Sequence, residues 1–165
     1  GIGKGNAIAK GLAKLDPEIK YIILTDADYT YPAKYVPKMI EVLENNPEVG
    51  MVCGNRFSGN AESKAVIKSF YLGNKLLSVS HSLFNRVSLV DPLTGLRVIR
   101  TKAIKGWIIK SQGFDIEVEL NHQIKQKGYK IVEVPIGYRK RLGEKKLKIR
   151  DGIIILRRIL SEILR

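Results

Sequence analysis

The chain has 165 residues, of which 44% are hydrophobic, and its 29 Lys and Arg against 16 Asp and Glu give a formal net charge of +13. This apolar content can form the core of one domain, which excludes a disordered basic tail. The sequence has a single cysteine, which excludes an internal disulfide scaffold. It contains no run of 18 uncharged apolar residues, so it predicts no membrane-spanning helix.

Helices and buried strands alternate in the first third of the chain. Helical spacing of apolar residues over 6–15 precedes a short apolar run at 21–25, which predicts a strand buried on both faces. A second helix over 32–45 precedes a second buried strand over 49–53. This alternation predicts an α/β layered fold with a largely parallel sheet.

The rest of the chain continues the α/β pattern with less regular spacing. Pro135 indicates that the strand containing it lies near an edge of the sheet. The predicted elements are helices over 63–89, 103–109, 115–127 and 149–165, and a strand over 130–136.

The last helix, 149–165, is amphipathic. We expect its apolar stripe to be Ile153, Leu156, Leu160, Ile163 and Leu164, with arginines off the stripe. Such a helix is typical of a segment lying in a membrane interface. Ordinary packing on the domain explains the same pattern equally well.

The sequence Asp26-Ala27-Asp28 directly follows the first predicted strand. The carboxyl edge of a parallel sheet is where α/β proteins bind ligands. Two carboxylates there suit Mg²⁺ or Mn²⁺ bound together with phosphate oxygens. A pair of helix caps ahead of Pro32 is the structural alternative.

Gly3-Lys4-Gly5 resembles a phosphate-binding loop but lacks the spacing of a P-loop or a dinucleotide fingerprint. It remains a glycine-rich helix entry, able to receive an anion or simply to start a helix. The segment 91–97 is a turn that holds an acid, a hydroxyl and a cation. Glu117 and Glu119 are either partners of a helix dipole or site residues, and Cys53 is expected in the core.

The positive charge is concentrated in the last two thirds of the chain. Residues 1–54 have a net charge of −1, whereas residues 55–165 have +14. Seven of the twelve residues in 139–150 are basic. This distribution indicates an anionic partner, such as a phosphorylated substrate, an acidic membrane surface or nucleic acid.

Taken in order, these motifs resemble the family 2 inverting glycosyltransferases with a GT-A fold, and most of all their polyprenyl-phosphate branch, the dolichyl-phosphate mannose and glucose synthases. The resemblance implies a three-layer α/β/α fold. The motifs that carry it are residues 3–7, 24–28, 31–32, 54–57, 91–97 and 113–114, together with Glu119, 134–136, Arg141, Gly143 and Lys146.

The resemblance also implies roles for individual residues. Asp26 and Asp28 resemble the pair that binds the divalent cation, and with Lys4 and Ala27 they are expected to hold the nucleotide sugar. Asp28, Asp91 and Arg97 are the expected catalytic residues. The residues expected to contact acceptor phosphate are Arg56, Thr94, Arg141 and Lys146.

The implied reaction moves mannose or glucose from a UDP- or GDP-hexose to a polyprenyl phosphate, with Mg²⁺ or Mn²⁺. We expect a cytoplasmic protein peripherally associated with the cytoplasmic face of a membrane, without a nucleic-acid partner. The alternatives are another family 2 enzyme acting on a glycan or lipid acceptor, or a basic nucleic-acid-binding module, which the absence of a recognisable binding motif disfavours.

Two departures from the family pattern stand out. Thr30 occupies the place of a glutamine that helps to hold the metal in the mannose synthases, and Lys145 stands where a serine is usual. The chain also begins at Gly1, after the strands that hold the nucleotide base in the family. We therefore expect residues 1–148 to form a partial, N-terminally truncated GT-A domain that is itself inactive, followed by the helix 149–165.

Overall fold

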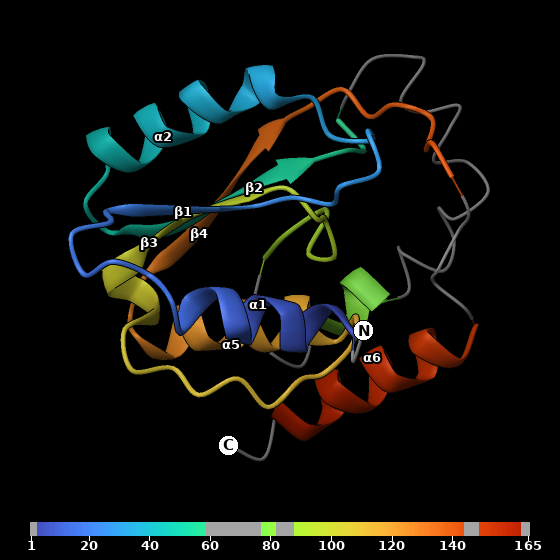
Figure 1. Cartoon of the computed structure of the whole chain (residues 1–165). Coiled ribbons are helices and arrows are strands. Elements are labelled where there is room, and N and C mark those ends of the chain that lie inside the picture. The colour runs from blue at the N-terminus through green and yellow to red at the C-terminus, as the bar shows by residue number, and fades with distance from the viewer. Residues whose placement is uncertain (1–2, 59–76, 82–87, 144–148, 163–165) are drawn as a thin grey trace.

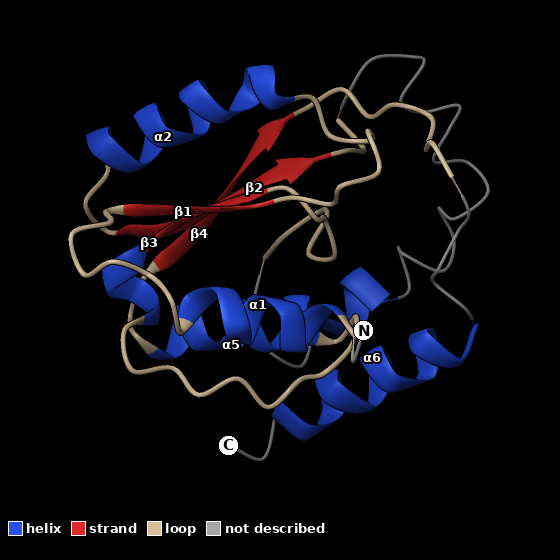
Figure 2. Cartoon of the chain, viewed as in Figure 1, coloured by secondary structure: helices blue, strands red, loops and turns tan. Residues whose placement is uncertain are grey.

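The computed structural model describes residues 3–58, 77–81, 88–143 and 149–162. A four-stranded sheet lies between helix α2 on one face and helices α1 and α5 on the other (Figures 1 and 2). Helix α6 lies outside α5, away from the sheet. The layered α/β arrangement expected from the alternating pattern is confirmed.

The strands are β1 (Tyr21–Leu24), β2 (Val49–Asn55), β3 (Arg97–Arg100) and β4 (Lys130–Pro135), in the spatial order β1-β3-β2-β4. Strand β4 pairs in parallel with β2, while β3 is antiparallel to both β1 and β2. Three strands therefore share one direction and β3 runs against them, so the sheet is mixed rather than largely parallel. The 91–97 turn lies near the carboxyl ends of β1 and β2, and a strand that starts there has to run backwards.

Helix α1 spans Lys4–Leu12, and α2 spans Val36–Asn45 after a 3₁₀ turn over Ala33–Tyr35. Helix α5 spans Ile116–Gln126, and α6 spans Ile149–Ser161. Each of these four helices falls within or close to its predicted range.

The helix predicted over 103–109 is wrong. A 3₁₀ turn covers Thr101–Ile104, and residues 107–112 are not helical. Gly106 has a φ of 76°, a left-handed conformation that ends the turn. Of the helix predicted over 63–89, residues 77–81 are helical and residues 88–89 are not, while the remainder lies outside the described residues.

The core has two parts, one on each face of the sheet, because successive side chains of a strand point to opposite faces. Val52 of β2 packs with Met39 and Leu43 of α2. Its neighbours Met51 and Cys53 pack on the other face, against α5. Every residue of β2 is buried, as its unbroken apolar sequence predicts.

Helix α6 packs on α5 through a different face from the one we expected. Ile155 and Ile159 are buried beside Val118 of α5. Ile153 and Leu160, which belong to the expected stripe, are 66% and 44% exposed. Isoleucine and leucine cover more than half of the helix circumference, so periodicity alone could not select the buried side.

Arg158 fixes the docking of α6. Its guanidinium pairs with the carboxylates of Asp115 and Glu119 at the start of α5, at 3.0 and 3.6 Å. A turn further along α6, Glu162 pairs with the same arginine at 3.4 Å. These ion pairs place Ile155 and Ile159 against α5 and leave the opposite face of α6 outside.

Candidate active site

The Asp26-Ala27-Asp28 segment begins two residues after the carboxyl end of β1, where it meets Lys4 at the start of α1. The Lys4 ammonium lies 2.7 Å from Asp26 Oδ1 and 2.5 Å from Glu117 Oε1. Burial disfavours the charged ammonium, but the carboxylates of Glu117 and Asp26 outweigh it and raise the pKa of Lys4 above its ordinary value. Lys4 therefore stays protonated and neutralises part of the carboxylate charge.

Asp28 is held by its own segment and by the basic loop that follows β4. Thr30 donates to Asp28 Oδ1 from its amide, at 3.2 Å, and from its hydroxyl, at 2.5 Å. The Arg141 guanidinium lies 3.0 Å from Asp28 Oδ2, and the Leu142 amide donates to the Asp28 carbonyl. Thr30 thus orients the carboxylate of Asp28.

The 91–97 turn lies directly against Asp26. A side chain at Gly95 would place its Cβ 2.5 Å from Asp26 Oδ2 and 2.9 Å from Asp26 Cγ, so the Asp26 carboxylate would have to move to admit it. The Gly95 amide donates to the Tyr31 hydroxyl at 2.7 Å. Burial raises the pKa of Tyr31 to about 12, so the phenol remains neutral.

Arg56 and Asp91 form a bidentate ion pair at the end of β2. Arg56 donates from Nε and Nη2 to the two Asp91 oxygens, each at 2.7 Å. The guanidinium also lies over the Tyr138 ring, 5.4 Å from its centre, and Tyr138 stacks edge-on against Tyr31. Asp26, Gly95, Tyr31, Tyr138, Arg56 and Asp91 therefore form one continuous network.

Glu133 of β4 is a supporting residue that sequence reasoning missed. Its carboxylate accepts the backbone amides of Val90 and Asp91, at 2.9 and 2.7 Å. It thereby fixes the main chain that carries Asp91. The only sequence signal was an acid among apolar residues in a strand.

Arg97 and Thr94 lie in the interior rather than on the open side of the network. Arg97 is 1% exposed, and it donates to the carbonyls of Thr94 and Pro92 and to Asn121 Oδ1. The Thr94 hydroxyl is buried and has no hydrogen-bond partner among the described residues. These contacts close the 91–97 turn from within.

Ala27 is exposed between the two aspartates, whereas Lys146 lies outside the described residues. Cys53 is buried, and burial raises the pKa of its thiol to about 11, which keeps it protonated as expected of a core residue.

The glycines beside Lys4 serve packing rather than anion binding. The amides of Gly5 and Asn6 donate to the Gln112 carbonyl, at 3.0 and 3.4 Å. A Cβ at Gly3 or Gly5 would lie 2.3 or 2.2 Å from a carbonyl oxygen of the 111–112 segment. The expectation of an anion-receiving helix entry therefore fails at these two amides, because the chain itself occupies them.

The two aspartates suit a divalent ion that arrives with a diphosphate. Among the described residues, no group of three or more His, Cys, Asp or Glu side chains is placed to hold a metal. Mg²⁺ is usually bound through one or two carboxylates plus substrate phosphates rather than by an all-protein cage. The hard oxygen donors of Asp26 and Asp28 match that mode of binding.

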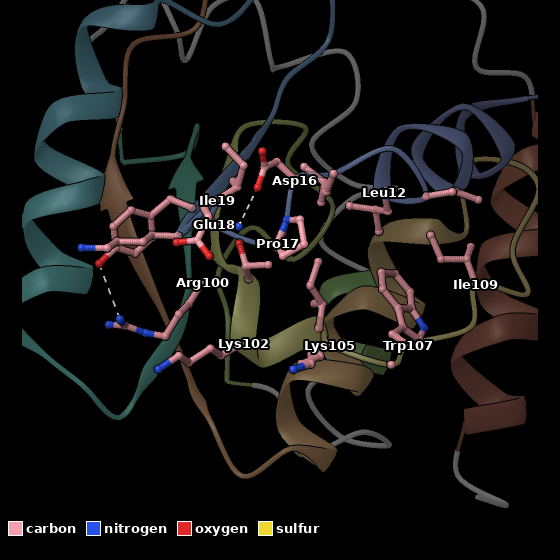
Figure 3. A pocket seen from close by; sticks show the side chains of 18 of the residues that line it. Leu12, Asp16, Pro17, Glu18, Ile19, Arg100, Lys102, Lys105, Trp107 and Ile109 are labelled. Atoms are coloured by element: carbon pink, nitrogen blue, oxygen red, sulfur yellow. Dashed lines mark hydrogen bonds between the residues drawn. The ribbon is translucent and has the colours of Figure 1, made fainter.

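A large hollow of about 980 Å³ lies elsewhere, beside α1 and the start of β1 (Figure 3). Leu12, Ile19, Arg100 and Trp107 are among its lining residues. It is lined by none of the predicted site residues. Size alone therefore does not identify the functional site.

A buried histidine near Arg97 predicts pH-dependent stability. Burial, and then the charge of Arg97, lower the pKa of His81 to about 4. Between pH 6.5 and pH 4, His81 is protonated in the unfolded chain but stays neutral in the folded chain. The free energy of unfolding therefore falls as pH drops from 6.5 towards 4. We expect this histidine to contribute a loss of about 2 kcal/mol between pH 7 and pH 5.

Urea unfolding of the wild type and of His81→Gln at pH 7 and pH 5 measures this contribution. The variant should lose correspondingly less stability on acidification. Equal losses in the two proteins would contradict the assignment to His81.

Most residues of this site lie in the part of the chain that matches a known protein family. Residues 1–108 match the family described as "Glycosyl transferase family 2". The chain belongs to glycosyl transferase family 2. The matched range contains Lys4, the two aspartates, Arg56 and the 91–97 turn, which confirms the family expected from the ordered motifs.

Two curated relatives of this family 2 chain carry names that refer to dolichyl phosphate. A dolichyl-phosphate hexose transferase from Haloferax volcanii is 31% identical over 144 residues, covering 87% of the chain and 61% of the relative. A dolichol-phosphate mannosyltransferase from Pyrococcus furiosus is 28% identical over 165 residues, covering 95% and 44%. The chain thus spans about half the length of the relatives it matches.

Solved structures confirm the GT-A fold. Glucosyl-3-phosphoglycerate synthase from Mycobacterium tuberculosis superposes with a TM-score of 0.69 at 16% identity, over 98% of the chain and 55% of the synthase. A complex of that synthase with Mn²⁺, UDP-glucose and phosphoglyceric acid gives a TM-score of 0.66 at 16% identity, with the same coverage. The family 2 chain therefore has the fold of an enzyme that binds a metal and a nucleotide sugar.

Proposed function

We propose that this family 2 protein transfers a hexose, mannose or glucose, from UDP- or GDP-sugar to a polyprenyl phosphate such as dolichyl phosphate. The observation that carries the proposal is the pair of aspartates at the end of β1, in one contact network with the Arg56–Asp91 pair. The names of the curated relatives support this substrate class.

The donor side of the site consists of Asp26, Ala27, Asp28 and Lys4. Exposed Ala27 leaves room for a nucleotide sugar beside the two carboxylates. Lys4 contributes an ammonium that can pair with the donor diphosphate. Mg²⁺ or Mn²⁺ held by Asp26 and Asp28 would neutralise the charge of the departing nucleotide diphosphate.

The acceptor side is basic. Arg141 pairs with Asp28, Arg56 pairs with Asp91 at the end of β2, and guanidinium matches the geometry of a phosphate group. We propose that both contact the lipid phosphate, together with Lys146, whereas the buried Thr94 hydroxyl supports the 91–97 turn from within. Arg141 has the more open position, since 31% of its side chain is exposed against 12% for Arg56.

The reaction needs no strong general base. The acceptor phosphate oxygen is already anionic near neutral pH, so it attacks the anomeric carbon as the bond to the nucleotide diphosphate breaks, with inversion. Catalysis then consists of positioning and electrostatic stabilisation. Asp28 contributes charge on the donor side, whereas Asp91 orients Arg56 and Arg97 holds the turn.

We further propose that the protein associates peripherally with the cytoplasmic face of a membrane through residues 149–165. The outer face of α6 combines three apolar side chains that are 42–66% exposed with two exposed arginines. These residues are Ile153, Ile154, Leu160, Arg150 and Arg157. No helix in the described parts of the chain has the length and apolarity needed to cross a bilayer.

Binding to lipid vesicles tests this surface. Replacing Ile153 and Leu160 by glutamate should lower partitioning onto anionic phosphatidylglycerol vesicles by about tenfold, because apolar area is lost and negative charge is introduced. Ile108→Glu is the matched control, since Ile108 is 80% exposed on another segment. Equal loss in the control would contradict a specific role for α6.

Product analysis tests the proposed reaction. Membranes from cells that express the full-length protein, supplied with labelled UDP- and GDP-hexoses and Mn²⁺, should form a sugar lipid that mild acid hydrolyses. No such product from any donor would overturn the proposal. An acid-stable glycan or glycolipid would instead identify a different acceptor within family 2.

A further inference from the structure

Lys4 is shared between two carboxylates, one from each side of the donor region. Asp26 comes from the loop after β1, and Glu117 comes from the first turn of α5, 113 residues from Lys4 in the sequence. Of these two carboxylates, only Asp26 is a proposed metal ligand. Glu117 has no role in the reaction described above.

Glu117 has spare capacity as a hydrogen-bond acceptor. Glu117 is 6% exposed, and its second carboxylate oxygen, Oε2, is buried without a hydrogen-bond partner among the described residues. A buried carboxylate oxygen without a partner is costly unless a ligand or another state of the protein satisfies it. An ammonium has three protons, and Lys4 uses two of them for Asp26 and Glu117.

Lys4 and Glu117 are fixed relative to each other. The amide of Gly5 is anchored to the carbonyl of Gln112, three residues before Asp115, which occupies the N-cap position of α5. Ser111 is in turn bonded to Asp115 and Glu119. These hydrogen bonds connect the backbone at the start of α1, which carries Lys4, to the start of α5, which carries Glu117. Asp26 lies on a separate loop.

We propose that Glu117 is a positioning residue that receives the Lys4 ammonium when a divalent cation binds to Asp26. This inference rests on the donor site of the proposed function. A cation at Asp26 repels the neighbouring ammonium, and Glu117 holds it within reach of the donor diphosphate. Without the charge of Glu117, Lys4 pairs with Asp26 alone and competes with the metal.

A double-mutant cycle on Mn²⁺ binding tests the inference. The probe is Mn²⁺ alone, and the readout is the electron paramagnetic resonance signal of unbound Mn²⁺. Removal of the competing ammonium by Lys4→Met should tighten binding about fivefold, and Glu117→Gln should weaken it about fivefold. In the Lys4→Met/Glu117→Gln double variant, the effect of Glu117→Gln should disappear, because there is no ammonium left to redirect.

UDP binding in the presence of saturating Mn²⁺ provides a second readout. Loss of the ammonium in Lys4→Met should weaken UDP binding about tenfold, opposite in direction to its effect on Mn²⁺. A structural role alone would weaken both ligands together. Lys10→Met, which removes an exposed lysine of the same helix, and Glu41→Gln, on the exposed side of α2, are the matched controls.

The outcomes separate this inference from the proposed function. If Asp26→Asn weakens Mn²⁺ binding but Lys4→Met does not change it, this inference alone is overturned. Equal weakening by Glu117→Gln with and without Lys4 also overturns it, since Glu117 would then act on the metal directly. No Mn²⁺ binding by the wild type would overturn it together with the metal part of the proposed function.

Discussion

Asp28→Asn is expected to lower sugar transfer by at least about 100-fold, the scale on which removal of one group that stabilises transition-state charge acts. Asparagine keeps the shape of the side chain and can still accept the two hydrogen bonds from Thr30. What it removes is the negative charge that pairs with Arg141 and would bind the cation. The fold should persist while catalysis is lost.

Initial rates of sugar-lipid formation, with Mn²⁺ binding to the purified protein, measure this effect. Asp16→Asn is the matched control, because Asp16 is exposed and its side chain accepts a hydrogen bond from the Glu18 amide, at 2.8 Å. Full activity in Asp28→Asn would remove Asp28 from the proposed metal site. Loss of activity together with a lowered unfolding midpoint would instead indicate a structural role.

Arg97→Met is expected to destabilise the protein by about 3 kcal/mol. Methionine has a similar length, but it leaves Asn121 Oδ1 and the Thr94 carbonyl without the donor they have now, and each orphaned buried group costs about 1–3 kcal/mol. Some of this cost is offset because a buried charge is also removed. Activity should fall with it, since the 91–97 turn carries both Asp91 and Gly95.

Chemical denaturation of Arg97→Met beside the wild type measures the loss. Arg157→Met, which changes an exposed arginine on α6, should leave stability within about 0.5 kcal/mol. An unchanged midpoint for Arg97→Met, with activity lost, would show that Arg97 acts on the substrate rather than on the turn.

Local sequence was sufficient to predict where the two aspartates lie in the fold. An apolar run followed by Asp26-Ala27-Asp28 predicts carboxylates at the end of a strand, and β1 ends two residues before Asp26. The continuous apolar stretch of β2 likewise predicts a strand covered on both faces. These two predictions hold because an apolar run and the residues that end it are local features. The strand over 21–25, predicted to be buried on both faces from the same kind of run, is instead the edge strand β1, with Ile23 46% exposed.

The tertiary contacts of the site residues could not be predicted from neighbouring residues in the sequence. The Lys4–Glu117 pair joins residues 113 positions apart, and Glu133 supports Asp91 across 42 positions. Neither pair has a periodic or spacing signal, because each depends on which strands and helices become neighbours. Arg97 was expected at the reaction centre for the same reason: its place in a motif is local, whereas its burial is not.

By itself, the sequence determined the order of helices and strands, the carboxylates after β1, the uneven charge and the family. The tertiary structure decided the direction of β3, the inward position of Arg97 and the buried face of α6. Local propensity and periodicity depend on residues a few positions apart, and these set the first group. The second group depends on packing and ion pairing between distant segments, such as Arg158 with Asp115, which exist only once the chain has folded.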